Sequence, residues 1–280
     1  MIISIASGKG GVGKTFVSTN LALSIEEENV QFLDCDVEEP NAHIFLKPQI
    51  ELIEPVNVLV PEVNENKCTY CNKCSEFCAY NAILVSPKKI VIFPELCHSC
   101  GGCSLVCTVN AIKEIPFKIG NIYKGKYQNI DLIYGELDVT RPLAVPIIKE
   151  VKKRIDKEKI VIVDCPPGAS CPVIESVKGS DFVILVTEPT PFGLHDLKIA
   201  VDVISGLKIP FGVIINRSDI GNKDLWDFLE RKNITLLLEI PFNRRIAEFY
   251  SNGIPVISYM PNLKEKFKIL FEKIKMMVKK

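Results

Sequence analysis

Eight of the eleven cysteines crowd into two short segments, and thiolates at such spacing are typical ligands of soft transition metals. Each segment spaces its cysteines as C-x2-C-x2-C-x3-C, and the second follows the first at an offset of 29 residues. The cysteines are Cys68, Cys71, Cys74, Cys78, Cys97, Cys100, Cys103 and Cys107. Ser75 corresponds to Ser104 and both segments continue into Asn-Ala-Ile, so with the four cysteines eight of sixteen aligned positions match. A duplicated metal-binding unit is the simplest explanation.

This spacing resembles the cysteine run of bacterial two-cluster ferredoxins, in which the fourth cysteine of each run binds the other cluster. The resemblance implies one [4Fe–4S] cluster on Cys68, Cys71, Cys74 and Cys107, and a second on Cys97, Cys100, Cys103 and Cys78. The usual proline after the fourth cysteine is replaced by Ala79 and Thr108, which leaves the reduction potentials open. Two zinc sites are the alternative, although zinc usually joins two separated C-x2-C pairs.

A phosphate-binding signature lies near the N-terminus. The sequence Gly8-Lys-Gly-Gly-Val-Gly-Lys-Thr15 fits G-x4-G-K-[ST] between an apolar run and a helical segment. Backbone N–H groups in such a loop point inward, and the following helix N-terminus adds positive potential. We expect Lys14 to pair with the β- and γ-phosphates and the Thr15 hydroxyl to bind Mg²⁺. The expected nucleotide-binding loop is Gly8, Lys9, Gly10, Gly11, Val12, Gly13, Lys14, Thr15 and Phe16.

The same loop contains a second lysine, Lys9, which an ordinary P-loop does not require. With it, the loop resembles the deviant Walker A motif of the MinD/ParA family, whose relatives include the nitrogenase iron protein. In that family this lysine crosses a dimer interface to phosphates bound in the other subunit. The resemblance implies an ATP-dependent homodimer in which Lys9 is catalytic. A solvated loop charge is the alternative interpretation.

Further residues match that family. Asp34 and Asp36 end the second apolar run, where the family places its first switch. The match implies that Asp36 orients the attacking water and that Asp34 lies near the magnesium ion. Asp164 ends another apolar run, as a Walker B aspartate does, so Thr15, Asp34, Asp36 and Asp164 form the expected Mg²⁺ site. Three positions match the segments around the adenine base: Asn216, Pro241 and Phe242.

The elements that must position these residues alternate along most of the chain. Short, nearly apolar runs predict strands buried on both faces, at 1–6, 30–33, 160–163, 182–186, 211–215 and 235–240. Amphipathic stretches predict helices at 14–27, 144–156, 194–205, 224–232 and 244–252. This order predicts an α/β doubly wound, mainly parallel sheet of the P-loop NTPase class, with ligands at the carboxyl ends of the strands.

The alternation stops near residue 61 and resumes near residue 120. We therefore predict a P-loop ATPase domain over residues 1–60 and 121–280, and an inserted ferredoxin-like α+β domain over residues 61–120. The linker 84–96 reads as a hairpin. Residues 119–127 read as a second hairpin that leads back to the host domain.

Composition excludes some classes of function. Lys+Arg and Asp+Glu both number 34, which argues against a general nucleic-acid binder. No apolar run approaches the ~20 residues of a membrane span, and residues 1–6 resemble a strand rather than a signal peptide. We expect a cytoplasmic protein, with the lysine-rich segment 263–280 forming a last core helix. A membrane-surface helix, as in the MinD tail, is the alternative for that segment.

Together these features predict an iron–sulfur ATPase with ATP, Mg²⁺ and two [4Fe–4S] clusters as cofactors. By analogy with the nitrogenase iron protein, closure of the dimer would drive electrons towards a metalloenzyme, its maturation machinery or a related ATPase. An iron–sulfur or metal-cofactor assembly factor or carrier is the alternative, although the C-terminal C-x2-C of carriers is missing. A membrane-positioning ATPase fits the clusters least. Cys171 is a further candidate ligand, while Cys35 and Cys165 are expected to be small buried side chains.

Overall fold

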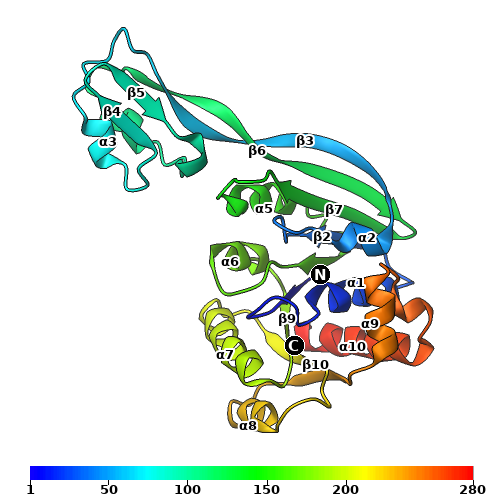
Figure 1. The fold of residues 1–280 in the computed structure, drawn as a ribbon. Helices are drawn as coiled ribbons and strands as arrows, with labels where there is room; N and C mark the ends of the chain where they lie inside the picture. The colour runs from blue at the N-terminus through cyan, green and yellow to red at the C-terminus, as the bar shows by residue number, and fades with distance from the viewer. Residues whose placement is uncertain (280) are drawn as a thin grey trace.

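The structure is a computed structural model and describes residues 1–279. Its centre is a nine-stranded sheet with the strand order β11-β10-β9-β1-β8-β2-β7-β6-β3 (Figure 1). The strands of this sheet are β1 (Ile2–Ala6), β2 (Val30–Asp34), β3 (Gln49–Val63), β6 (Ile112–Tyr127), β7 (Ile130–Leu137), β8 (Ile160–Asp164), β9 (Phe182–Thr187), β10 (Phe211–Asn216) and β11 (Leu236–Ile240).

Helices lie on both faces of the sheet and at the end of a long extension (Figure 1). They are α1 (Lys14–Ser24), α2 (Ala42–Leu46), α3 (Lys73–Phe77), α4 (Gly102–Leu105), α5 (Ala144–Lys152), α6 (Cys171–Val177), α7 (Pro191–Gly206), α8 (Asp224–Arg231), α9 (Arg244–Ser251) and α10 (Pro261–Val278). Short 3-10 turns occupy Pro94–Leu96 and Val256–Ser258.

All six apolar runs form strands of the sheet, and β1, β2, β8, β9, β10 and β11 pair in parallel. Two apolar cores follow from this arrangement, one on each face. The first joins α1 and α10 to the sheet through Phe16, Leu21 and Phe267. The second packs α5, α6, α7 and α8 against the other face, through residues such as Ile147 and Leu197. The predicted mainly parallel α/β sheet is therefore confirmed.

The last helix, α10, buries one face in the first core. Its buried side chains are Leu263, Phe267, Leu270, Phe271 and Ile274. The expected core helix is thus confirmed, with its lysines on the outer side. Within residues 1–279, no helix combines the length and the apolar character needed to cross a membrane.

Three strands were not predicted. Strand β7 pairs in parallel with β2, and β6 and β3 follow as antiparallel neighbours. The expectation of a hairpin over 119–127 is wrong, because this segment is the second half of the single strand β6. The hairpin turn lies instead at 128–129, between β6 and β7. The first seven residues of β3 are exposed, so this edge strand lacks the apolar run that identified the central strands.

Strands β3 and β6 continue beyond the carboxyl edge of the sheet as a two-stranded arm (Figure 1). Gly120 of β6 pairs with Leu137, the last residue of β7, so residues 112–119 extend past the sheet together with 57–63 of β3. The register of β3 shifts between Val56 and Asn57, where the arm leaves. Seven residues at ~3.3 Å each make an arm of roughly 23 Å. The predicted domain boundaries at 61 and 120 fall inside these two strands.

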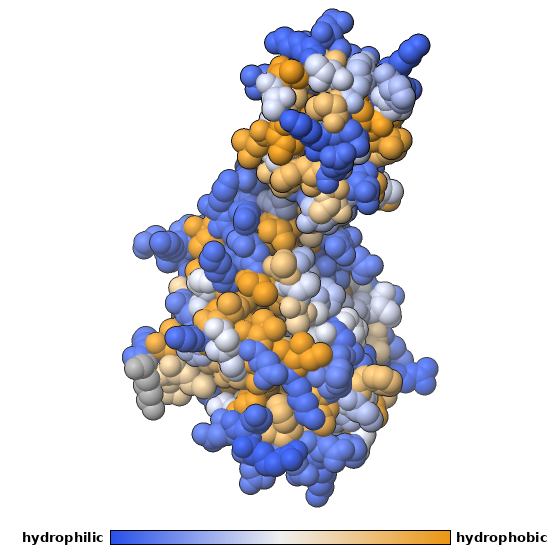
Figure 2. All heavy atoms as spheres, turned by 90° about the vertical axis from the view of Figure 1, so that its left-hand side faces the viewer, coloured by the Kyte–Doolittle hydropathy of each residue, from blue (hydrophilic) through white to orange (hydrophobic). Residues whose placement is uncertain are grey.

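The end of the arm carries residues 64–111. This segment holds α3, α4 and the antiparallel pair β4 (Ile83–Ser86) and β5 (Lys89–Ile92), so the hairpin predicted near 84–96 is present. Arg141, just after β7, ties the arm to the body. Its guanidinium lies 4.4 Å from the Phe117 ring centre and 3.3 Å from the Glu95 carboxylate. Figure 2 looks onto the side that lies at the left in Figure 1, where apolar side chains gather both on the end of the arm and on the body below it.

Candidate functional site

The glycine-rich loop connects the end of β1 to the start of α1 at Lys14. Gly11 and Gly13 have φ of +77° and +98°, which side chains other than glycine rarely adopt. A Cβ on Gly8 would lie 2.2 Å from the Asp196 carbonyl oxygen of α7, so only glycine fits there. The Asn216 side-chain amide donates to the Val12 carbonyl oxygen at 2.8 Å and fixes the loop from β10. The loop therefore has a backbone path that only glycine permits at these positions, and it is tied to β10.

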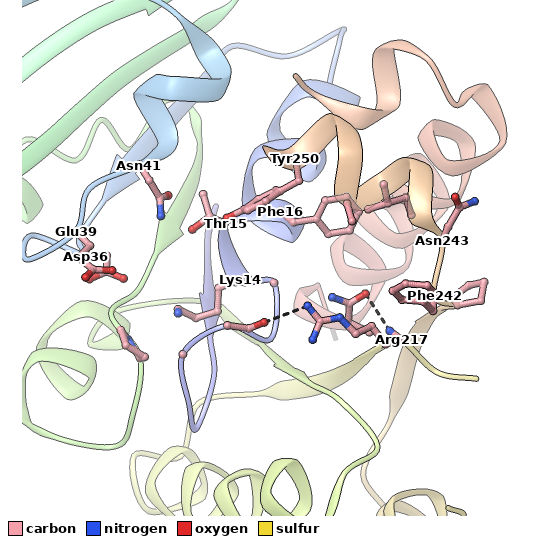
Figure 3. Close-up of a pocket in the computed structure, with 18 residues that line it drawn as sticks. Lys14, Thr15, Phe16, Asp36, Glu39, Asn41, Arg217, Phe242, Asn243 and Tyr250 are labelled. Atoms are coloured by element: carbon pink, nitrogen blue, oxygen red, sulfur yellow. Dashed lines mark hydrogen bonds between the residues drawn. The ribbon is translucent and has the colours of Figure 1, made fainter. Parts of the chain in front are cut away.

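A cavity of about 370 Å³ opens beside this loop (Figure 3). This volume lies in the range of small-ligand sites. Ten residues expected to bind the nucleotide or its magnesium line the cavity: Gly10, Gly11, Gly13, Lys14, Thr15, Phe16, Asp36, Asn216, Pro241 and Phe242. Five others expected at the site are not part of the lining: Gly8, Lys9, Val12, Asp34 and Asp164.

Eight lining residues were not predicted: Glu39, Asn41, Pro167, Arg217, Asn243, Ile246, Ala247 and Tyr250. In Figure 3, Phe242 and Asn243 lie at the end of the cavity opposite Asp36 and Glu39. One end therefore offers an aromatic ring and an amide, and the other offers carboxylates beside the Lys14 ammonium. A planar heterocycle at the first end and phosphates at the second would suit this division.

Asp164 is a fully buried carboxylate, and neither of its oxygens has a hydrogen-bond partner among residues 1–279. It lies in register with Asp34 on the neighbouring strand. Burial raises the pKa of both groups, and for Asp34 the nearby Asp164 charge adds to the effect. The Lys14 charge lowers the pKa of Asp164 in opposition to burial. Two buried carboxylates side by side also suit a divalent cation, and oxygen ligands of this type suit Mg²⁺.

Asp34 has a structural task in addition. Its carboxylate accepts hydrogen bonds from the backbone N–H groups of Asp36, Asn41 and Ala42 at 3.0–3.1 Å. These bonds hold the loop between β2 and α2, which carries Asp36 towards the cavity. Burial raises the pKa of Asp36 to about 6, while the nearby Lys14 acts in the opposite direction. Asp36 is thus a polar side chain held at the phosphate end by a fixed loop.

Lys9 points away from the cavity and binds Glu188, the residue after β9. Its Nζ atom lies 2.7 Å from Glu188 Oε1, and the Arg217 guanidinium lies 2.7 Å from Glu188 Oε2. Sequence reasoning missed both Glu188 and Arg217. Glu188 and Arg217 directly follow β9 and β10, two residues after the predicted ends of these strands at 186 and 215, so charged residues at strand ends were the signal that could have found them.

The eight clustered cysteines line two small hollows at the end of the arm. The first hollow is lined by Cys68, Cys71, Cys74 and Cys107, among others. The second is lined by Cys78, Cys97, Cys100 and Cys103, among others. Each hollow therefore combines three cysteines of one run with the fourth cysteine of the other. All eleven cysteines of the chain are free thiols; Cys35 and Cys165 are buried, as expected, and Cys171 is exposed at the start of α6.

Backbone N–H groups point at four of these sulfurs, and the pattern repeats at the 29-residue offset. In the first run, Tyr70 donates to Cys68 Sγ and Ala82 donates to Cys78 Sγ, both at 3.3 Å. The equivalent bonds in the second run reach Cys97 Sγ at 3.4 Å and Cys107 Sγ at 3.2 Å. N–H donors of this kind stabilise thiolate charge and tune cluster potentials.

Backbone strain follows the same repeat. Tyr70 and Ser99 have φ of +56° and +55°, and Asn81 and Asn110 have φ of +52° and +49°. Such conformations persist where the surroundings require them. Across residues 1–279, no three His, Cys, Asp or Glu side chains are grouped closely enough to hold one metal ion. The four thiolates that bind a [4Fe–4S] cluster lie farther apart than the ligands of a single metal ion, because the cluster itself lies between them. The four cysteines of each hollow fit such a cluster.

Most of the chain matches a known protein family. Residues 3–256 match the family described as the CobQ/CobB/MinD/ParA nucleotide binding domain. The chain belongs to this family. The resemblance to MinD/ParA proteins is thereby confirmed.

Proteins similar to this chain carry different names. An uncharacterized protein of Methanocaldococcus jannaschii is 35% identical over 279 residues, with 98% of this chain and 96% of the relative covered. The iron–sulfur cluster carrier protein of Rickettsia bellii is 27% identical, with 94% of this chain and 69% of the relative covered. The MinD structure of Pyrococcus horikoshii, complexed with Mg-ADP, has a TM-score of 0.59 at 22% identity and covers 98% and 95% of the two chains. The chain therefore has a MinD-like P-loop NTPase fold.

Proposed function

We propose that this protein binds and hydrolyses ATP, and that ATP-driven closure of a homodimer controls two [4Fe–4S] clusters at the end of the arm. The clusters would pass electrons to a metalloenzyme or to its maturation machinery. The observation that carries the proposal is the grouping of eight cysteines into two crossed sets of four. These sets lie on an arm whose strands are also strands of the nucleotide-binding sheet.

The ATPase half rests on the P-loop and the carboxylates beside it. Lys14 and the loop N–H groups would hold the phosphates, and the Asn216 and Phe242 end of the cavity would hold the base. Thr15 and Asp164 would hold Mg²⁺, which neutralises phosphate charge when bound. Asp36 would accept a hydrogen bond from the attacking water and orient it. Lys9 would reach the phosphates of the partner subunit.

The connection between the two halves rests on two backbone hydrogen bonds at the base of the arm. Leu137 at the end of β7 donates to the Val37 carbonyl oxygen at 2.8 Å, and Val37 directly follows Asp36. The next residue, Asp138, donates to the Ile119 carbonyl oxygen of β6 at 2.8 Å, where the arm begins. A change of the loop around Asp36 on ATP binding would therefore move the root of the arm.

The order of the clusters follows from their place on the arm. Val63 and Ile112, a pair at the tip, line the hollow of the first set, whereas Leu59 and Pro61 line the hollow of the second. The second hollow is therefore closer to the body. Cys97 also packs against the second core. Bound clusters supply one-electron chemistry, so the distal site would face an external partner and the proximal site would face the ATPase.

An iron–sulfur carrier is the second candidate. Relatives such as the Rickettsia bellii protein are named iron–sulfur cluster carriers. In addition, Cys71 and Cys100, one in each set, are exposed to solvent, which would favour release of a cluster. In this version ATP-driven closure would move a cluster rather than an electron. Both versions keep the division into an ATPase part, 1–60 and 121–280, and a ferredoxin-like part, 61–120.

Anaerobic reconstitution followed by iron and sulfide analysis tests the cluster half. We expect about eight iron and eight sulfide per chain. The exposed Cys171 offers a matched control, because Cys171→Ser should keep all the iron whereas Cys71→Ser should lose about half. Two zinc ions and no sulfide would overturn the proposal. Incubation of the loaded protein with an apo-ferredoxin then separates the versions: clusters that stay bound through ATP turnover favour electron transfer, and clusters that move favour the carrier.

A further inference from the structure

Glu188 lies between two cations at the carboxyl edge of the sheet. Strand β9 is the neighbour of both β1 and β10, so the residue after β9 is flanked by the P-loop and by the segment after β10. Lys9 approaches one Glu188 oxygen and Arg217 approaches the other, each at 2.7 Å. The Glu188 side chain is only 12% exposed, compared with 31% for Lys9 and 44% for Arg217. The carboxylate is therefore the fixed centre of the cluster.

The surrounding backbone supports this arrangement. Arg217 has φ of +52°, a left-handed conformation that is uncommon for a residue with a long side chain. It also donates to the Gly11 carbonyl oxygen of the P-loop at 3.5 Å and lines the nucleotide cavity (Figure 3). The pKa of Glu188 is lowered, because the Lys9 hydrogen bond and the charges of Lys9 and Arg217 together outweigh the opposing effect of burial. Glu188 is thus ionised and paired twice.

We propose that Glu188 is a positioning residue that holds Lys9 within its own subunit until the dimer closes, and that Arg217 keeps Glu188 paired once Lys9 has left. This inference rests on the proposed function, in which Lys9 crosses to the phosphates of the partner. A nearly buried carboxylate left without a cation is strongly unfavourable. The second cation removes that obstacle, so Lys9 can leave without stranding Glu188.

Two substitutions should therefore act in opposite directions. Glu188→Gln keeps the shape of the side chain and removes the charge that retains Lys9, so it should favour the dimer. Arg217→Gln leaves Lys9 as the sole cationic partner of Glu188, beside the Thr190 hydroxyl at 3.5 Å, so the departure of Lys9 becomes more costly and the dimer should weaken. The double variant should behave like Glu188→Gln, because the charge that needs a partner is gone. A merely structural ion pair would not produce this reversal.

Sedimentation equilibrium with Mg²⁺ and a non-hydrolysable ATP analogue measures the effect. Because partly exposed ion pairs are worth up to ~1 kcal/mol, we expect a dimer dissociation constant about fivefold lower for Glu188→Gln and about fivefold higher for Arg217→Gln. Asp131→Asn is the matched control, since Asp131 pairs with Lys159 at 2.8 Å at the opposite edge of the sheet. Its dimer should match the wild type. The analogue's affinity for each monomer, measured below the dimerisation range, separates altered nucleotide binding from altered association.

The accessibility of Lys9 provides a second measurement. In the nucleotide-free protein, acylation by a succinimidyl ester read out by peptide mass spectrometry should label Lys9 faster in Glu188→Gln than in the wild type. A wild type that dimerises, combined with a Glu188→Gln variant whose dimer is unchanged or weaker, would overturn this inference alone. A wild type that stays monomeric at saturating analogue would overturn the proposed homodimer, and the role of Glu188 with it.

Discussion

Replacing Asp164 with asparagine should stabilise the nucleotide-free protein and at the same time weaken its response to MgADP. The Asp164 side chain is fully buried, and both of its oxygens lack a hydrogen-bond partner among the described residues. It also lies in register with the buried Asp34 carboxylate. Asparagine keeps the shape and removes the charge, so the free protein loses the cost of burying this carboxylate, which the nearby Lys14 charge offsets only in part.

The size of the effect follows from these contacts. A buried polar group without a partner costs about 1–3 kcal/mol, and a charged group costs more. We therefore expect Asp164→Asn to raise the free energy of unfolding of the nucleotide-free protein by about 2 kcal/mol. For a chain of this size that corresponds to roughly 4–8 °C in Tm. In contrast, a nucleotide at 100 times its Kd stabilises the wild type by about 2.7 kcal/mol, and the variant should lose most of the Mg²⁺-dependent part of this gain.

Thermal unfolding with and without MgADP, followed by circular dichroism, tests both the higher stability and the weaker response to MgADP. The matched control is Asp156→Asn, because Asp156 is a surface carboxylate whose pKa is lowered by its hydrogen bond to Lys159. The control should destabilise slightly or not at all, and it should keep the full response to MgADP. An Asp164→Asn variant that is less stable than the wild type without nucleotide, and that still responds fully to MgADP, would refute the reasoning.

Three further predictions concern the clusters, the dimer and the arm. Cys107→Ser should lower bound iron to about four per chain. Adding Cys68→Ser should remove no more iron, whereas adding Cys97→Ser should remove the rest. Crossed ligation would be refuted if Cys68→Ser removed the remaining iron and Cys97→Ser did not. Asp36→Ala should accumulate an ATP-bound dimer in light scattering, because water positioning is lost while phosphate binding is kept; a monomer at saturating MgATP would contradict this. Arg141→Gln removes one ion pair and one cation–π contact, so hydrogen exchange at the arm's base should quicken about tenfold, and unchanged exchange would contradict the anchoring role.

The central strands and the P-loop could be predicted because local sequence dictates them. A strand buried on both faces must be apolar at nearly every position, as in Ile160–Asp164, and the P-loop needs glycine where φ is positive. Strands β3 and β6 could not be identified in this way. Their pairing is nonlocal and much of their surface is exposed, so polar residues such as Glu51, Glu54 and Asn57 interrupt the apolar residues of Gln49–Val63. The arm is therefore a product of pairing between distant segments.

The candidate site divides along the same line. Motif residues such as Lys14 and Asp164 can be identified from the residues next to them in the sequence. Glu188, Arg217 and Tyr250 belong to no such motif; the first two directly follow β9 and β10, and the third lies in α9. Their contribution depends on the strand order, which places β9 between β1 and β10. The 29-residue repeat of the cysteine runs, by contrast, was visible in the sequence and recurs in the backbone as matched N–H···S bonds.

An anaerobic redox titration of the reconstituted protein, with and without MgATP, tests most directly whether the nucleotide site and the clusters are coupled. Coupling between sites is typically worth about 1–3 kcal/mol, which for a one-electron couple corresponds to a shift of roughly 50–130 mV. We predict such a shift with MgATP, together with a matching change in ATP affinity between the oxidised and the reduced protein, as thermodynamic reciprocity requires. Potentials that stay the same with MgATP, and an ATP affinity that ignores the redox state, would contradict the proposed ATP-gated electron transfer.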